Sequence, residues 1–139
     1  MGEALAAATR ALARRDYSER GLRERLLRTG VDEAELTETL EELRRVGLLD
    51  DERFAARRAM ALAERGKGDR AIRFDLRRQG VETDLAERAV DALEPEQARA
   101  ARIILRRGAG PKTARLLAGR GFEREVVELA AEDSIAPEQ

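Results

Sequence analysis

A short motif returns three times along this 139-residue chain: a leucine, three further residues, a glycine, a large apolar residue and an acid. Its glycines are Gly30, Gly80 and Gly121, which lie 50 and 41 residues apart. Repeats near this length are typical of units of a few helices that stack as an array. Array proteins usually bind along an extended surface. The motif therefore favours partner binding over catalysis.

The composition predicts an almost wholly helical protein. Charged residues make up 40% of the chain and aromatic residues only 3%, and there are only three prolines. Alanine, leucine, arginine and glutamate dominate, and all four favour helix. Because β-branched residues are few, little material is left for a sheet. We expect a core of leucine, alanine, valine and isoleucine.

The pattern of apolar residues and helix stops predicts about nine helices in three sets of three. We place the three-helix units at residues 1–49, 50–94 and 95–133, followed by a frayed tail at residues 134–139. The fold class is thus an all-α tandem array, elongated and curved.

Residues at the predicted helix ends have suitable local chemistry. Ser18 can cap the second helix, and Gly30 fits the position after it, where the chain needs a positive φ. Asp32 and Glu35 have the spacing of a capping box at the start of the third helix. Pro95 suits the first position of the seventh helix.

The join between the first two units, residues 46–51, has two interpretations. It could be a linker that lets the first unit swing. We favour instead that Leu48 and Leu49 pack against the second unit, because apolar residues seldom form a free linker. Asp50 or Asp51 then caps the fourth helix.

Charge alternates along the chain although the net charge is only −1. Residues 53–78 hold nine basic and three acidic side chains, whereas residues 79–96 hold one and six. In each unit the first two helices are basic and the third is acidic. If the units stack in similar orientations, one side of the molecule is a basic stripe that steers a charged partner. The alternative is pairing between neighbouring helices, which contributes only about 0–1 kcal/mol for each exposed pair.

The residue types exclude several function classes. The chain has no cysteine and no histidine, which excludes disulfides and sites built from these two metal ligands. Acids at residues 50–52 are more simply explained by a helix start than by a metal. The stretch around Lys67 lacks the spacing of a phosphate-binding loop. No apolar run is long enough for a membrane span or a signal peptide. We therefore expect a cytoplasmic protein that is neither an enzyme nor dependent on a cofactor.

The order and spacing of several segments resemble the RecX family over roughly residues 4–131. These segments are Arg15-Asp16-Tyr17-Ser18, then Leu22 through Leu26 to Gly30-Val31, the run from Val46 to Ala55, and Gly66 to Gly68 followed by Ile72, Leu76 and Gly80-Val81. Residues 108–113 and Gly119 depart from the family pattern, which makes the third unit's contacts the least transferable.

The resemblance implies three tandem three-helix repeats and a regulatory activity without catalysis. Proteins of this family bind RecA recombinase and usually inhibit it, limiting filament growth, ATPase activity and strand exchange. The implied partners are RecA and the groove of the RecA–DNA filament, with weak direct binding of DNA through the basic face. We expect a monomer that does not associate with membranes.

The residues predicted to contact the partner come from the basic stretches of the first two units. They are Arg14, Arg15, Tyr17, Arg57, Arg58, Arg65, Lys67, Arg70, Arg73 and Arg77. Tyr17 is either an exposed anchor or, as we favour, a ring packed between two helices. The alternative functions are a helical DNA-binding transcriptional regulator and a structural adaptor. Acidic third helices argue against the former, because a recognition helix must approach DNA.

Overall fold

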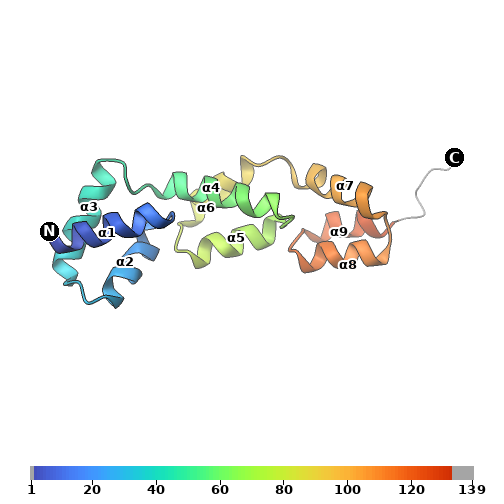
Figure 1. Cartoon of the computed structure of the whole chain (residues 1–139). Helices are drawn as coiled ribbons and strands as arrows, with labels where there is room; N and C mark the ends of the chain where they lie inside the picture. The colour runs from blue at the N-terminus through green and yellow to red at the C-terminus, as the bar shows by residue number, and fades with distance from the viewer. Residues whose placement is uncertain (1, 133–139) are drawn as a thin grey trace.

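The computed structural model describes residues 2–132, and over this range it is built from nine helices with no strand. The helices are α1 (Gly2–Arg14), α2 (Glu19–Arg28), α3 (Glu33–Arg45), α4 (Asp51–Glu64), α5 (Asp69–Arg78), α6 (Thr83–Asp91), α7 (Glu96–Arg107), α8 (Pro111–Gly119) and α9 (Arg124–Ala131). They follow one another along an elongated molecule, with the first three at one end and the last three at the other (Figure 1). The all-helical prediction is confirmed; the predicted tail at residues 134–139 lies outside the described part of the chain.

Each consecutive triplet of helices has its own hydrophobic core. Leu22, Leu36 and Leu40 are completely buried in the first triplet, and Ile72 and Leu76 in the second. The third core is built around the buried residues Ile103, Leu117, Phe122 and Val126. Helices that pack closely on each other belong to the same triplet. The molecule is therefore three small cores in a row, and the joints between them decide how the triplets are oriented.

Local chemistry explains the helix ends. Ser18 accepts a hydrogen bond from the Gly21 N–H at 3.0 Å, and Gly30 adopts a φ of +89°, as predicted. Asp32 accepts from the Glu35 N–H at 3.2 Å, which is the predicted first half of a capping box. The Glu35 carboxylate accepts from the Ala4 N–H at 3.1 Å, so that it also joins α3 to α1. This bond is the main reason that the pKa of Glu35 is lowered.

Two predictions about the chain between triplets are wrong. Leu49 is buried in the first core and Leu48 is 58% exposed, so neither packs against the second triplet as predicted. The cause is Gly47, whose φ of +82° lets the N–H groups of Leu48 and Leu49 both return to the Leu43 carbonyl. Pro95 precedes α7 as its N-cap and does not occupy the first helical position.

The middle helices of successive triplets meet end to end (Figure 1). At the first joint the Ser18 hydroxyl, before α2, donates to the Gln79 carbonyl, after α5, at 2.5 Å. At the second joint the Gly68 N–H, before α5, donates to the Arg120 carbonyl, after α8, at 2.8 Å. The carbonyl end of one helix thus faces the amide end of the next, which is the favourable arrangement of helix dipoles.

An acid from the next triplet completes each joint. Asp51 opens α4 and accepts from the Glu19 N–H of α2 at 2.8 Å. Glu96 opens α7 and accepts from the Asp69 N–H of α5 at 2.7 Å. Asp50, one residue earlier, caps α4 itself by accepting from Arg53. Each carboxylate therefore lies at the positive end of a middle helix in the preceding triplet.

The last triplet lacks the donors that these joints use. Pro111 begins α8 and has no N–H, whereas Glu19 and Asp69 supply one at the same place in α2 and α5. The Gly110 N–H donates to the Ala130 carbonyl of its own triplet at 2.8 Å. A further triplet therefore could not join α8 through the same hydrogen bonds.

Candidate partner-binding surface

The acids of the middle helices are paired in a way that leaves many arginines of the same helices uncompensated. α2 and α5 contain two acids each, and α8 contains none. Three of the four acids pair with arginines from first or third helices. These pairs are Arg44–Glu19, Arg58–Asp75 and Arg99–Asp69. The positive charge of the middle helices is consequently available to a partner.

Several arginines of α5 line a groove between α5 and α8 with a volume of about 860 Å3, which we call the α5 groove. Arg70, Phe74, Arg77 and Arg78 line its α5 side, and its α8 side consists of the small residues Ala118 and Gly119. Among residues 2–132, none of these three arginines forms an ion pair.

Phe74 is an exposed aromatic ring in this basic groove. Its side chain is 65% exposed, and the Arg78 guanidinium lies 5.7 Å from the ring centroid. Arg70 precedes Phe74 by one helical turn and Arg77 follows it by another, so all lie on one side of α5. Arginine can bind carboxylate or phosphate in a bidentate way, and an aromatic ring can stack on a planar group.

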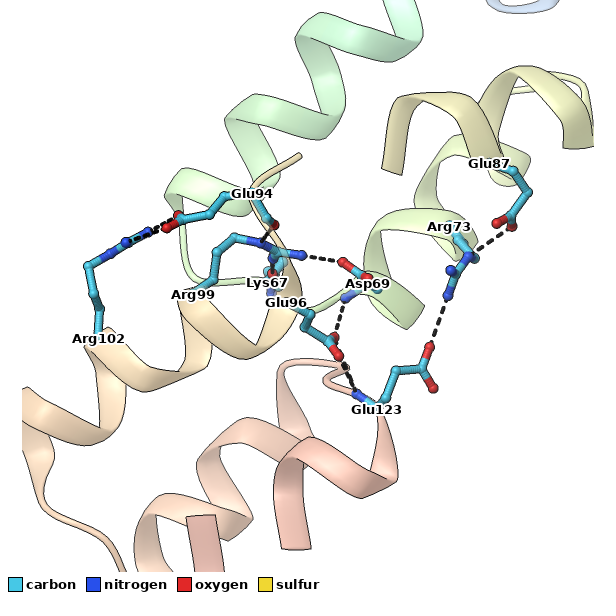
Figure 2. Close-up of polar contacts among 9 residues, drawn as sticks. All are labelled: Lys67, Asp69, Arg73, Glu87, Glu94, Glu96, Arg99, Arg102 and Glu123. Carbon is cyan, nitrogen blue, oxygen red and sulfur yellow. Dashed lines mark hydrogen bonds and ion pairs between the residues drawn. The ribbon is translucent and has the colours of Figure 1, made fainter. Parts of the chain in front are cut away.

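Arg73 lies on the same helix but is used within the molecule. Its guanidinium pairs with Glu87 of α6 at 2.8 Å and with Glu123, before α9, at 2.9 Å (Figure 2). Burial lowers the pKa of Arg73, but the charges and hydrogen bonds of Glu87 and Glu123 outweigh burial and raise it. Arg73 therefore links the second triplet to the third as a permanent cation.

A second basic groove of about 360 Å3, which we call the α4 groove, lies where α4 passes the end of α1. Arg15, Arg57, Arg58 and Arg65 all line it. Arg57 lies 3.5 Å from Asp16, also in the groove, and both side chains are largely exposed. Arg58 is held by Asp75 of α5, whose hydrogen bonds are the main reason for its raised pKa.

The structure divides the predicted contact residues among several places. Seven of them lie in the two grooves: Arg15, Arg57, Arg58 and Arg65 in the α4 groove, and Arg70, Arg73 and Arg77 in the α5 groove. Arg14 lines a different groove, on the first triplet. Tyr17 is half-buried against the first core, with the Arg15 guanidinium 4.5 Å from its ring centroid. Lys67 is half-buried, and its carbonyl accepts from Arg99 at 3.0 Å.

Two residues of the α5 groove, Phe74 and Arg78, were missing from the predicted set. A sequence signal for Phe74 existed, because it lies between Ile72 and Leu76 and two residues from each. That spacing places its ring off the apolar face of α5. An aromatic residue at such a position in an arginine-rich helix indicates a binding surface.

The arrangement of arginines is suited to binding anionic groups. No group of three or more candidate metal ligands occurs within the described residues. No helix between residues 2 and 132 is long and apolar enough to cross a membrane. The two grooves present arginine side chains on an elongated helical scaffold.

Comparison with known proteins identifies the family of this scaffold. A family model described as the first three-helix domain of RecX matches residues 4–43, and one described as the second matches residues 50–90. The protein named Regulatory protein RecX of Acidithiobacillus ferrooxidans is 35% identical over 132 residues, covering 88% of this chain and 84% of that protein. Its namesake in Syntrophotalea carbinolica is 41% identical over 95 residues, or 68% of this chain and 62% of that protein.

A solved structure shares the fold. The crystal structure of RecX from Lactobacillus salivarius matches with a TM-score of 0.78, covering 93% of this chain and 92% of that one. The sequences are only 17% identical, so this likeness concerns the arrangement of helices alone.

Proposed function

This chain belongs to the RecX family of regulatory proteins, and we propose on that basis that it regulates RecA recombinase, mainly as an inhibitor. In this proposal it binds RecA, or the groove of the RecA–DNA filament, and limits filament growth, ATPase activity and strand exchange. The mechanism is occupation of a surface and involves no chemical step.

The observation that carries the proposal, beyond the family, is the uncompensated arginine of the α5 groove at the centre of the array. Arg70, Arg77 and Arg78 have no acidic partner among the described residues, because the acids of α5 pair with Arg58 and Arg99. A filament offers regularly spaced charge, and an elongated molecule can lie across neighbouring subunits. Contacts with acidic protein side chains or with DNA phosphates both satisfy these arginines.

The test is single-strand-dependent ATP hydrolysis by RecA of the same organism, with and without this protein. We expect the native protein to lower the rate at up to equimolar amounts. The double substitution Arg70→Glu and Arg77→Glu should require about tenfold more protein for the same effect, because it reverses charge where no internal ion pair is lost. The matched control is Arg106→Glu with Arg107→Glu, which changes the charge equally at the end of α7.

Two results would contradict the proposal. One is an unchanged ATPase rate at equimolar native protein. The other is equal inhibition by the α5 variant and by its control, which would remove the α5 groove from the mechanism.

The salt dependence of binding is a second measurement. If the α5 variant has lost contacts with DNA phosphates, its affinity should decrease less steeply with salt concentration than that of the native protein. Tight duplex binding with strong sequence preference would favour the transcriptional regulator instead.

A further inference from the structure

A third groove lies on the first triplet, apart from the two surfaces discussed above. It is an open space of about 630 Å3 between α1 and α2. Arg10 and Arg14 reach it from α1, and Arg25 reaches it from α2. All three are exposed, and none forms an ion pair within residues 2–132. Within the described part of the chain, Glu3 is the only acid in its lining.

The second triplet provides an internal reference for this groove. Ala8 of α1 corresponds to Ala59 of α4, and Leu26 of α2 corresponds to Leu76 of α5, all four being buried in their own cores. The repeated leucine–glycine motif sets the register of α2 against α5, at 50 residues. The buried positions set the register of α1 against α4, at 51 residues, because Ala4, Ala8 and Ala11 then match Ala55, Ala59 and Leu62. Each position of the first groove can therefore be compared with its counterpart between α4 and α5.

The comparison shows that an ion pair is missing. Between α4 and α5 the corresponding space contains Arg58, which is bound by both carboxylate oxygens of Asp75. In the first triplet Ala7 stands at the position of Arg58, and Arg25 stands at the position of Asp75. The long side chain is replaced by a methyl group, and the acid by an arginine. The first triplet therefore has room and positive charge where the second has a closed, neutral pair.

We infer that this groove, the α1 groove, binds an acidic peptide segment, with carboxylates of the peptide in the space left by Ala7. Arg10 and Arg14 are one helical turn apart, about 5–6 Å between their Cβ atoms. They can thus meet two acids one turn apart on a helical peptide, while Arg25 approaches from the opposite wall. Bidentate arginine–carboxylate pairing supplies both affinity and orientation.

The walls of the groove distinguish a peptide from a nucleic acid. They are formed by small and aliphatic side chains, Ala7, Ala11, Leu26 and Val31, and none of the described residues that line them is aromatic. Single-stranded nucleic acids are held by stacking of bases on aromatic rings as well as by charge. An aliphatic wall suits the methylene groups of peptide side chains instead. The inference does not depend on the proposed action on RecA, which is argued from the α5 groove.

The experiment measures fluorescence anisotropy of a labelled helical peptide of about 14 residues with glutamates one turn apart. A peptide with glutamine in place of glutamate serves as the uncharged reference. The decisive variant combines Ala7→Arg with Arg25→Asp, which installs in the first triplet the ion pair that the second already contains. We expect this variant to fold, as judged by circular dichroism, and to bind the acidic peptide at least about tenfold more weakly.

A control variant and a competing ligand keep the test decisive. Arg107→Ala changes the net charge by the same amount outside the groove and should leave peptide binding unchanged. Arg10→Ala with Arg14→Ala should weaken binding without filling the space. Undiminished binding by the variant with the installed pair would overturn the inference. Equal affinity for the glutamine peptide would also overturn it, as would tighter binding of single-stranded DNA of the same charge.

Discussion

The two joints between triplets follow one plan but are built from different materials. At the first joint a side chain lies between the middle helices, because the Ser18 hydroxyl reaches the Gln79 carbonyl. At the second joint Gly68 brings the backbones into direct contact, and a Cβ added there would lie 2.4 Å from backbone atoms of Phe122. The Arg70 N–H adds a second backbone hydrogen bond, to the Gly121 carbonyl at 3.0 Å.

Ion pairs sharpen this contrast. At the second joint the Arg99 side chain is only 8% exposed, pairs with Asp69, and donates to the carbonyls of Lys67 and Glu94 at 3.0 Å each (Figure 2). At the first joint Arg57 and Asp16 lie 3.5 Å apart and are 62% and 54% exposed. Solvent screens such an exposed pair, which contributes little.

This difference bears on how the array moves. In a linear array each unit contacts only its neighbours, so the interface terms decide which units unfold and reorient together. The direct backbone contact and the buried ion pair predict that the second and third triplets behave as one block. The first triplet, held by side chains and exposed charges, is the part expected to adjust its orientation on a partner.

Substitution of Gly121, where the second joint is tightest, is expected to cause the largest loss of stability. Gly121 and Gly30 both have positive φ, at +85° and +89°. A Cβ on Gly121 would lie 2.4 Å from the Ala71 Cβ, whereas one on Gly30 would meet nothing within 4 Å. We expect Gly30→Ala to cost about 1 kcal/mol of backbone strain and Gly121→Ala about 3 kcal/mol, because overlap is added. Urea unfolding measures both; equal losses would show that the joint is loosely packed.

A smaller effect is expected from Arg99. Arg99→Met leaves two carbonyls and Asp69 without their donor, which should cost about 2–3 kcal/mol. Arg57→Met, at the first joint, should cost less than about 1 kcal/mol. The sharpest measurement is hydrogen exchange at the N–H groups of Gly68 and Arg70, which donate across the second joint. Unchanged protection of these two amides in Arg99→Met would refute the role of the arginine.

The smallest effect concerns the acids of the joints and depends on pH. Burial raises the pKa of Glu96 above its ordinary 4.5, although the N–H groups of Asp69 and Glu123 donate to it and oppose the rise. Burial likewise raises the pKa of Asp51. Protonation of these carboxyl groups therefore stabilises the folded protein. This stabilisation is fully present below the pKa that the group has in the unfolded chain, and it is lost as pH rises through the pKa that the group has in the folded protein. Lowering the pH into the interval just above 4.5 should make native protein gain stability relative to Glu96→Gln.

Paired unfolding curves at neutral pH and near pH 5 would check this change. Comparing variant with native protein cancels the contributions of surface acids such as Glu42 and Glu94, whose pKa values are lowered by their arginine partners. Asp51→Asn should show the same sign at the first joint. A gain of the variant over native protein on acidification would contradict the assignment.

Much of the local structure could be predicted from the sequence because its causes are local. Ser18, Gly30 and Asp32 act on groups within four residues, so their roles can be read from spacing. The positions of Leu48 and Leu49 could not be predicted in this way, because a turn at Gly47 returns Leu49 to the first core. In the same way, the sequence does not show that the guanidinium groups of Arg58 and Arg73 bind Asp75 of α5 and Glu123 near α9.

By itself the sequence determined the helical class, the repeat and the ends of most helices, because apolar spacing, caps and glycines act over a turn or two of chain. Tertiary structure alone decided which charges are neutralised and which remain for a partner. Arg73 and Glu123, for example, are 50 residues apart and meet only because α8 joins α5 end to end. Charge acts through space, and its partners are set by packing.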